Sequence, residues 1–113
     1  SNVEIKDTME IIIQAGDARV FVAKAIDLLG DFKYEEAEAL MKKANEKLVA
    51  AHRIQTKKLQ KEAEGENPQY SVLFTHAQDT LMTINSEYNI VKHLIIVFKK
   101  RYEHNKEKSN ENK

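Results

Sequence analysis

Apolar residues recur every three or four positions along most of this chain, the spacing that places them on one face of an α-helix. The pattern breaks at Gly30-Asp31 and again at residues 65–68, which contain Gly65 and Pro68. Glycine often caps a helix, and proline commonly follows a helix end, so both places are turn signals. The sequence therefore predicts three helices, over about residues 6–29, 32–64 and 69–102, with Gly30 as a left-handed cap and Asp31 capping the next helix.

Each predicted helix has a stripe of mainly apolar residues that we expect to face the core. The expected core stripes are Met9, Ile12, Ile13, Gly16, Val20 and Ala23 in the first helix, Ala37, Leu40, Met41, Ala44, Leu48, Ala51, Gln55 and Leu59 in the second, and Leu73, Ala77, Ile84, Tyr88, Val91 and Ile95 in the third. Helices joined by short turns pack antiparallel. We therefore expect an all-α, up-down-up, antiparallel three-helix bundle.

The third helix carries another stripe, about 90° round from its core stripe. Its members are His76, Asp79, Thr80 and Thr83, followed by Ile90, Leu94, Val97 and Phe98. The stripe thus begins polar and becomes apolar. A helix with two apolar faces needs two partners, so we expect this face to pack on something outside its own bundle.

The composition of the chain bears on its number of domains, its partners and its compartment. The chain has 113 residues, three glycines and one proline, which fits one helical domain over residues 1–102. The 18 basic and 18 acidic residues cancel, which disfavours nucleic-acid and membrane-surface binding. No signal peptide and no membrane-spanning run are evident, and the absence of cysteine fits a reducing compartment, so we expect a cytoplasmic protein. Residues 103–113 contain no apolar residue and are expected to form a disordered polar tail.

Four unusual residues are expected to meet in one layer. Gly16 interrupts the first helix, His52 and Gln55 fall on the inward side of the second, and His76 begins the polar stripe of the third. Gly16, Gln55 and His76 each lie about 12–14 Å from the same end of the predicted bundle, and His52 can share their layer. Gly16 could allow a close approach or pack on a bulky neighbour. His52 and Gln55 could form an internal hydrogen bond or support a site.

His76 is the candidate reactive group. A His-x-x-Asp pair, here His76 and Asp79, points the same way from a helix, but no Ser-His-Asp arrangement accompanies it. A lone helical imidazole surrounded by neutral groups, such as Gln78, Gln55 and Thr80, suits carriage of a phosphoryl group better than hydrolysis. A loosely held group is easily passed on, although Asp79 would repel it unless its charge is neutralised.

Three stretches carry a specific likeness to a known family. They are Ala15-Gly16-Asp17-Ala18-Arg19, Ala51-His52-Arg53-Ile54-Gln55-Thr56, and His76-Ala77-Gln78-Asp79 followed by Leu81-Met82-Thr83. In this order and spacing, the chain resembles the lactose/cellobiose (N,N′-diacetylchitobiose) IIA component of the bacterial sugar phosphotransferase system. The likeness covers roughly residues 5–102.

The resemblance implies both a reaction and an assembly. His76 would accept a phosphoryl group from the histidine phosphocarrier protein and pass it to a cysteine of the cognate IIB component, which serves the membrane component IIC. The third helices would surround the axis of a homotrimer, where the Asp79 carboxylates would share a divalent cation such as Mg²⁺. The family commonly has a second histidine where this chain has Thr80, a hydroxyl that cannot take over acid–base work. That departure keeps open an alternative, in which the chain is a non-catalytic interaction or regulatory module.

Overall fold

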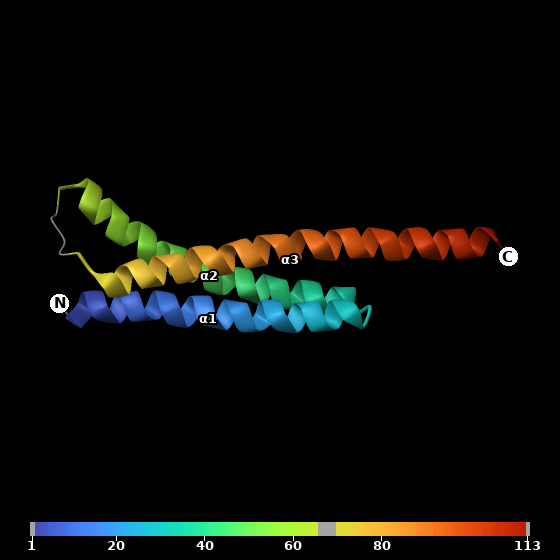
Figure 1. The fold of residues 1–113 in the computed structure, drawn as a ribbon, viewed down its shortest axis with the longest axis horizontal. Coiled ribbons are helices and arrows are strands. Elements are labelled where there is room, and N and C mark those ends of the chain that lie inside the picture. Colours follow the sequence, from blue (N-terminus) through green and yellow to red (C-terminus); the bar gives the residue numbers. More distant parts are fainter. Residues whose placement is uncertain (1, 66–69, 113) are drawn as a thin grey trace.

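The computed structural model describes residues 2–65 and 70–112. Those residues form three helices, α1 (Asn2–Gly30), α2 (Tyr34–Ala63) and α3 (Val72–Glu111), with no strand among them. Figure 1 shows α1 and α3 running the same way and α2 returning against them. The predicted all-α, up-down-up bundle is therefore confirmed. The molecule measures 70 × 22 × 18 Å because α3 projects well beyond the other two helices.

The first turn differs from the prediction. Gly30 is still helical, and the left-handed position falls on Phe32, whose φ is 63°. The N–H groups of Phe32 and Lys33 donate to carbonyls of the last turn of α1, at 3.1 and 3.0 Å, so the chain reverses by bonding back to the helix. A bulky residue is strained in this conformation. The Phe32 ring packs on Tyr102, with centroids 5.7 Å apart, and this contact offsets part of the strain.

The starts of α2 and α3 also differ from the expected capping. Asp31 was expected to cap α2, but Lys33 occupies the N-cap position and forms no side-chain cap bond. At the start of α3, the Ser71 hydroxyl accepts a hydrogen bond from the Phe74 N–H at 3.1 Å. The predicted start at residue 69 lies outside the described residues. The Ser71 cap fixes the first turn of α3, which is the turn that precedes His76.

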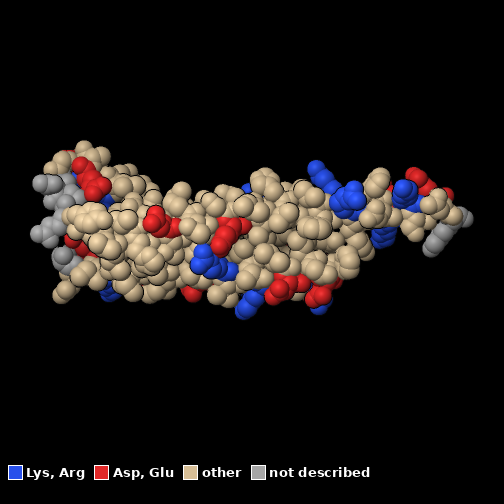
Figure 2. Space-filling view, in the orientation of Figure 1, with Lys and Arg blue, Asp and Glu red and all other residues tan. Residues whose placement is uncertain are grey.

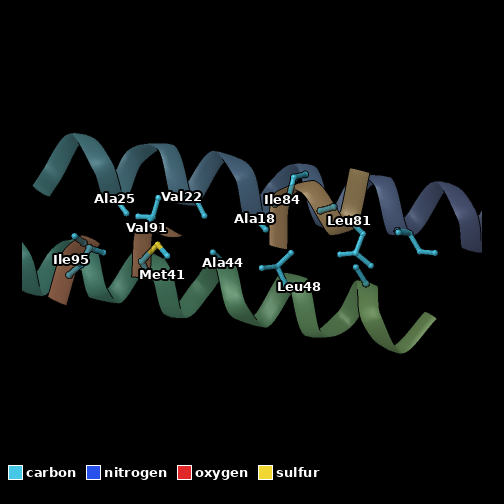
Figure 3. Packing of buried hydrophobic residues seen from close by; sticks show 14 of the residues in the cluster. Ala18, Val22, Ala25, Met41, Ala44, Leu48, Leu81, Ile84, Val91 and Ile95 are labelled. Carbon is cyan, nitrogen blue, oxygen red and sulfur yellow. The ribbon is translucent and has the colours of Figure 1, made fainter. Parts of the chain in front are cut away.

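The core runs along the bundle axis. Figure 3 shows Ala18 of α1, Leu48 of α2 and Ile84 of α3 pointing toward one another. The alanines that recur every seven residues in α2 are completely buried, and so are three alanines of α1. Small side chains on both facing surfaces let these two helices approach closely. The buried hydrophobic residues are Ile11, Ala15, Ala18, Val22, Ala25, Leu29, Ala37, Met41, Ala44, Leu48, Ala51, Phe74, Ala77, Leu81, Ile84, Val91 and Ile95.

The predicted core stripe of α1 is wrong, whereas those of α2 and α3 are largely correct. Met9, Ile13 and Val20 are 41%, 50% and 52% exposed, and the buried side of α1 is the neighbouring stripe of smaller residues. The hydrophobic pattern favoured the larger side chains, but packing against α2 requires the alanines. In α2 only Leu59 departs clearly, since it is exposed. The bulky residues of α1 therefore form an outward apolar stripe.

The predicted end of α3 is also wrong. The helix continues past Tyr102 to Glu111, so residues 103–111 are helical where a disordered tail was expected. This segment contains no glycine or proline, and its Glu and Lys residues are good helix formers. All of its side chains are exposed, so backbone hydrogen bonding alone maintains it. No helix in the described ranges has an apolar stretch long enough to cross a bilayer.

Candidate functional site

His76 lies at the start of α3, one turn after the Ser71 cap, and its side chain is exposed. No described residue forms a hydrogen bond or ion pair with its ring. A side-chain hydrogen bond reaches only its backbone in the described structure: the Thr80 hydroxyl donates to the His76 carbonyl oxygen at 2.8 Å. Thr80 is thereby held against the helix. The arrangement leaves an imidazole open to solvent and to an approaching partner.

Asp79 is exposed one turn further along and has no ion-pair partner among the described residues. Within those residues there is also no group of three His, Cys, Asp or Glu side chains that could hold a metal ion. Within one subunit, Asp79 is thus a lone carboxylate without an ion-pair partner among the described residues. A cation held by Asp79 would therefore take its other ligands from outside the described subunit, as water or as groups of another chain.

The face that carries His76 is the flank of α3 nearest α1. Glu87 accepts hydrogen bonds from Arg19 of α1 at 2.9 and 3.1 Å. Glu87 is eleven residues after His76, about three full turns, so the two lie on nearly the same side of α3. The sequence could not pair Arg19 with Glu87, because the pairing depends on how α1 and α3 are aligned. This ion pair marks which flank of the bundle presents His76.

Gln78 lies on the other flank of α3. It follows His76 by two residues, about 200° round the helix, and precedes Ile96 by five full turns. Ile96 lines a groove with Met41 and Lys42 of α2, so Gln78 faces the α2 side. Within one subunit, Gln78 and His76 therefore point in nearly opposite directions, and Gln78 cannot support His76 of its own chain.

Neither of the two unusual residues of α2 forms a hydrogen bond with His76 in the described structure. The Gln55 side-chain oxygen is buried and has no hydrogen-bond partner in the described structure. His52 is partly buried beside Val49 and Arg53, in a shallow hollow lined by α2 alone. His52 follows Glu38 by fourteen residues, and Glu38 pairs with Lys99 of α3 at 3.3 Å. His52 thus lies on the α2–α3 side of the bundle, the same side as Gln78.

The ion pairs also give the relative heights of the helices. Lys47 of α2 lies 3.7 Å from Asp17 of α1, and Arg19 pairs with Glu87. Counting residues from these pairs, at a rise of about 1.5 Å per residue, puts Gln55 and His76 at about the same height along the bundle axis. The layer expected from the sequence remains a prediction for these two residues.

Gly16 does not belong to that layer. The same registers put it about 9–12 Å further along the bundle than His76. A Cβ atom added at Gly16 would meet nothing within 4 Å, so neither a close helix nor a bulky neighbour accounts for it within one subunit. Gly16 instead interrupts the outward apolar stripe of α1.

A three-helix bundle whose third helix begins with the exposed His76 defines a class of small all-helical domains. The chain belongs to the family of lactose/cellobiose-specific IIA subunits of the sugar phosphotransferase system, whose sequence model matches residues 6–99. The lactose-specific EIIA component of Staphylococcus epidermidis is 42% identical over 91 residues, covering 80% of this chain and 88% of that protein. The oligo-beta-mannoside-specific EIIA component of Bacillus subtilis is 36% identical over 92 residues, covering 81% and 84%.

A solved structure supports the same relationship. The crystal structure of the cellobiose-specific enzyme IIA from Bacillus anthracis superposes with a TM-score of 0.81 at 34% identity, covering 90% of this chain and 97% of that one. The family and fold implied by the sequence motifs are therefore confirmed, and the chain is a component of a sugar phosphotransferase system.

Proposed function

We propose that the chain carries a phosphoryl group on His76. The observation that supports this most directly is the exposed imidazole, free of hydrogen bonds from described residues, within a chain of this family. The donor would be the phosphorylated histidine phosphocarrier protein. The acceptor would be a cysteine of the cognate IIB component, which in turn serves the membrane component IIC.

Each transfer is a single displacement at phosphorus. A ring nitrogen of His76 attacks the phosphorus of the donor phosphohistidine, an N–P bond forms on His76, and the donor N–P bond breaks to release a neutral imidazole. In the second step a cysteine thiolate of IIB attacks the same phosphorus, an S–P bond forms, and the His76 N–P bond breaks. The nucleophile must align opposite its leaving group, and the exposed position of His76 permits this approach.

A homotrimer would supply the groups that one subunit cannot bring to His76. In a cyclic assembly, unlike surfaces of neighbouring copies meet. With α3 around the axis, the His76 flank of one copy faces the flank of the next copy that carries Gln78 and His52. Their amide and imidazole groups could then hydrogen-bond a phosphoryl group without clamping it. Gln55 would support this layer only indirectly, through the core, and Gly16 would leave room for a neighbouring chain.

Asp79 would be the oxygen ligand of a divalent cation at the trimer axis, with Mg²⁺ as our candidate. The carboxylate is exposed and unpaired among described residues, and one from each subunit gives a set of hard oxygen ligands. When bound, the ion would neutralise carboxylates that otherwise repel one another and the phosphoryl group. The proposed role of the ion is assembly rather than chemistry at phosphorus.

We place the proposed reaction in the cytoplasm, during uptake of a lactose- or cellobiose/chitobiose-type sugar. The specificities of the relatives support this class of sugar, since they are for lactose, cellobiose and an oligo-β-mannoside. Choice among such sugars belongs largely to the membrane component.

The test is phosphoryl uptake measured by intact mass. The protein is incubated with phosphoenolpyruvate and the two general phosphotransferase proteins, and we expect one phosphoryl adduct. His76→Ala should lose the adduct while its far-ultraviolet circular dichroism stays helical. His93→Ala is the matched control, because His93 is another exposed histidine of α3 and should leave uptake unchanged.

Two results would contradict the proposal. Uptake retained by His76→Ala would assign the phosphoryl group to another residue. No uptake by the wild-type protein, with the general proteins shown to phosphorylate another IIA, would favour the second candidate, a regulatory module that keeps the fold. The observation behind that candidate is Thr80, whose hydroxyl is bonded to the helix backbone where relatives commonly have histidine.

A further inference from the structure

The outward face of α3 changes character along its length. Residues spaced alternately by four and three follow one side of a helix that packs against like helices. On α3 this seam is apolar at Ile90, Leu94 and Val97, which are 61%, 40% and 53% exposed in one subunit. The same spacing then reaches Arg101, His104 and Lys108, so the seam becomes basic just where α3 leaves the bundle, and it ends at Glu111, the last residue of the helix.

These basic side chains form no ion pair with any described residue of their own subunit. Arg101 and Lys108 are exposed and take part in no ion pair among the described residues. Lys99, on the opposite side of α3, is paired with Glu38 of α2. Figure 2 shows lysine and arginine side chains gathered over the narrow projecting end of the molecule, where α1 and α2 no longer cover α3. The seam residues are thus free to face another copy.

In the proposed homotrimer this free end becomes a cationic ring. The inference rests on that assembly, with α3 helices parallel around the axis. Each copy contributes Arg101, His104 and Lys108 to about 10 Å of axis. Unneutralised like charges at this spacing repel, so the helices must either separate or share a counterion. A guanidinium presents donors in a planar fork that matches phosphate oxygens.

We propose that this end of the trimer axis binds a polyvalent oxyanion of the phosphate class, held by Arg101 and Lys108 from all three copies with His104 between them. The site is the electrostatic counterpart of the Asp79 carboxylates, at the other end of α3. A bound anion draws the projecting helices together and extends the trimer contact beyond Val97. Two carboxylates compete with the anion: Glu107, on the flank of the same segment, and Glu111, the next seam position after Lys108.

The test measures binding of inorganic phosphate by the intact trimer. Light scattering first establishes the trimer, and calorimetric titration at constant ionic strength then measures phosphate affinity. We expect saturable binding near one phosphate per trimer, with a melting temperature that rises with phosphate and levels off.

Arg101→Gln and Lys108→Gln should each weaken binding by about tenfold or more, as expected for lost charge-assisted hydrogen bonds. Lys106→Gln removes an equal charge about 200° round the helix from Lys108 and should leave affinity unchanged.

The outcomes separate this inference from the proposed function. A trimer that binds no phosphate, or that loses affinity equally in Lys106→Gln, would overturn the site and leave phosphoryl carriage by His76 standing. Phosphate binding that remains in Arg101→Gln and Lys108→Gln would also overturn it. A protein that takes up a phosphoryl group but is monomeric would remove both the trimer and this site.

Discussion

Gln55 places a buried amide oxygen in the core with no hydrogen-bond partner among the described residues. An unsatisfied buried acceptor costs about 1–3 kcal/mol. Leucine has a similar volume and no polar atom, so Gln55→Leu should raise the free energy of unfolding by about 1 kcal/mol or more. Urea denaturation with an unchanged m-value would measure this. Phosphoryl uptake should be unaffected, because no hydrogen bond joins Gln55 to His76.

The contrary result is equally informative. A Gln55→Leu variant that is less stable by about 1 kcal/mol would mean that the amide oxygen has a partner in the assembled protein. Gln55→Ala is the accompanying control, because it removes the amide but also leaves a cavity. It should therefore be less stable than Gln55→Leu.

At the scale of single residues, helical periodicity predicts the face on which a side chain lies but not its surroundings. Spacing alone puts Gln55 on an apolar stripe and His76 on a polar one, since both follow from helical periodicity. The environment of Gly16 depends on distances between helices, which periodicity does not contain. Phe32 takes a left-handed conformation that the nearby Gly30 was expected to supply, and its contact with Tyr102 joins residues far apart in the chain.

At the scale of elements, the end of α3 is helical without any packing. Residues 103–111 are all exposed, and an isolated helical segment of this length is marginal in water. We expect their backbone amides to exchange with deuterium far faster than those around Leu81, which is fully buried. Mass-spectrometric hydrogen exchange in phosphate-free buffer would measure the difference. Slow exchange across 103–111 under those conditions would show that another contact stabilises the segment.

The helices themselves were predictable, but their faces were only partly so. Two turn signals and one helical period sufficed for three helices in the observed order. In α1 the prediction chose the stripe with Ile13 and Val20, because large side chains dominate a hydrophobic pattern. The core instead contains the adjacent stripe with its alanines. Small residues are favoured there because α1 and α2 lie close together. A helix with two apolar sides cannot be oriented from its own sequence.

At the scale of the whole molecule, α1 and α3 both expose apolar stripes. Met9, Ile13 and Val20 line one, and the seam of α3 from Ile90 to Phe98 forms the other. Soluble monomers rarely keep such extended apolar surfaces in contact with water. The α3 stripe was anticipated from the sequence as a face in need of a second partner. The α1 stripe adds to it, and together they support the proposed homotrimer.

A charge placed on the seam should dissociate that trimer without unfolding the subunit. Val97→Glu puts three carboxylates near the axis, where they are desolvated and repel. We expect light scattering to report monomers, while circular dichroism stays helical. Val3→Glu is the matched control, because Val3 is 68% exposed at the start of α1, away from this seam. A trimer that survives Val97→Glu would move the interface to another face.

Asp79 is expected to make the same assembly depend on a divalent cation. If three Asp79 carboxylates share Mg²⁺ at the axis, a chelator should expose their mutual repulsion and lower the melting temperature of the wild-type trimer. Asp79→Asn keeps the shape of the side chain and removes its charge, so the melting temperature of this variant should not respond to the chelator or to added Mg²⁺.

Glu87→Gln is a fitting control, because it removes a carboxylate from the same helix that is already paired with Arg19. Differential scanning calorimetry with and without chelator compares all three proteins. Equal chelator sensitivity in wild type and Asp79→Asn would place the cation elsewhere, and insensitivity of both would mean that the carboxylates are kept apart or neutralised by the protein itself.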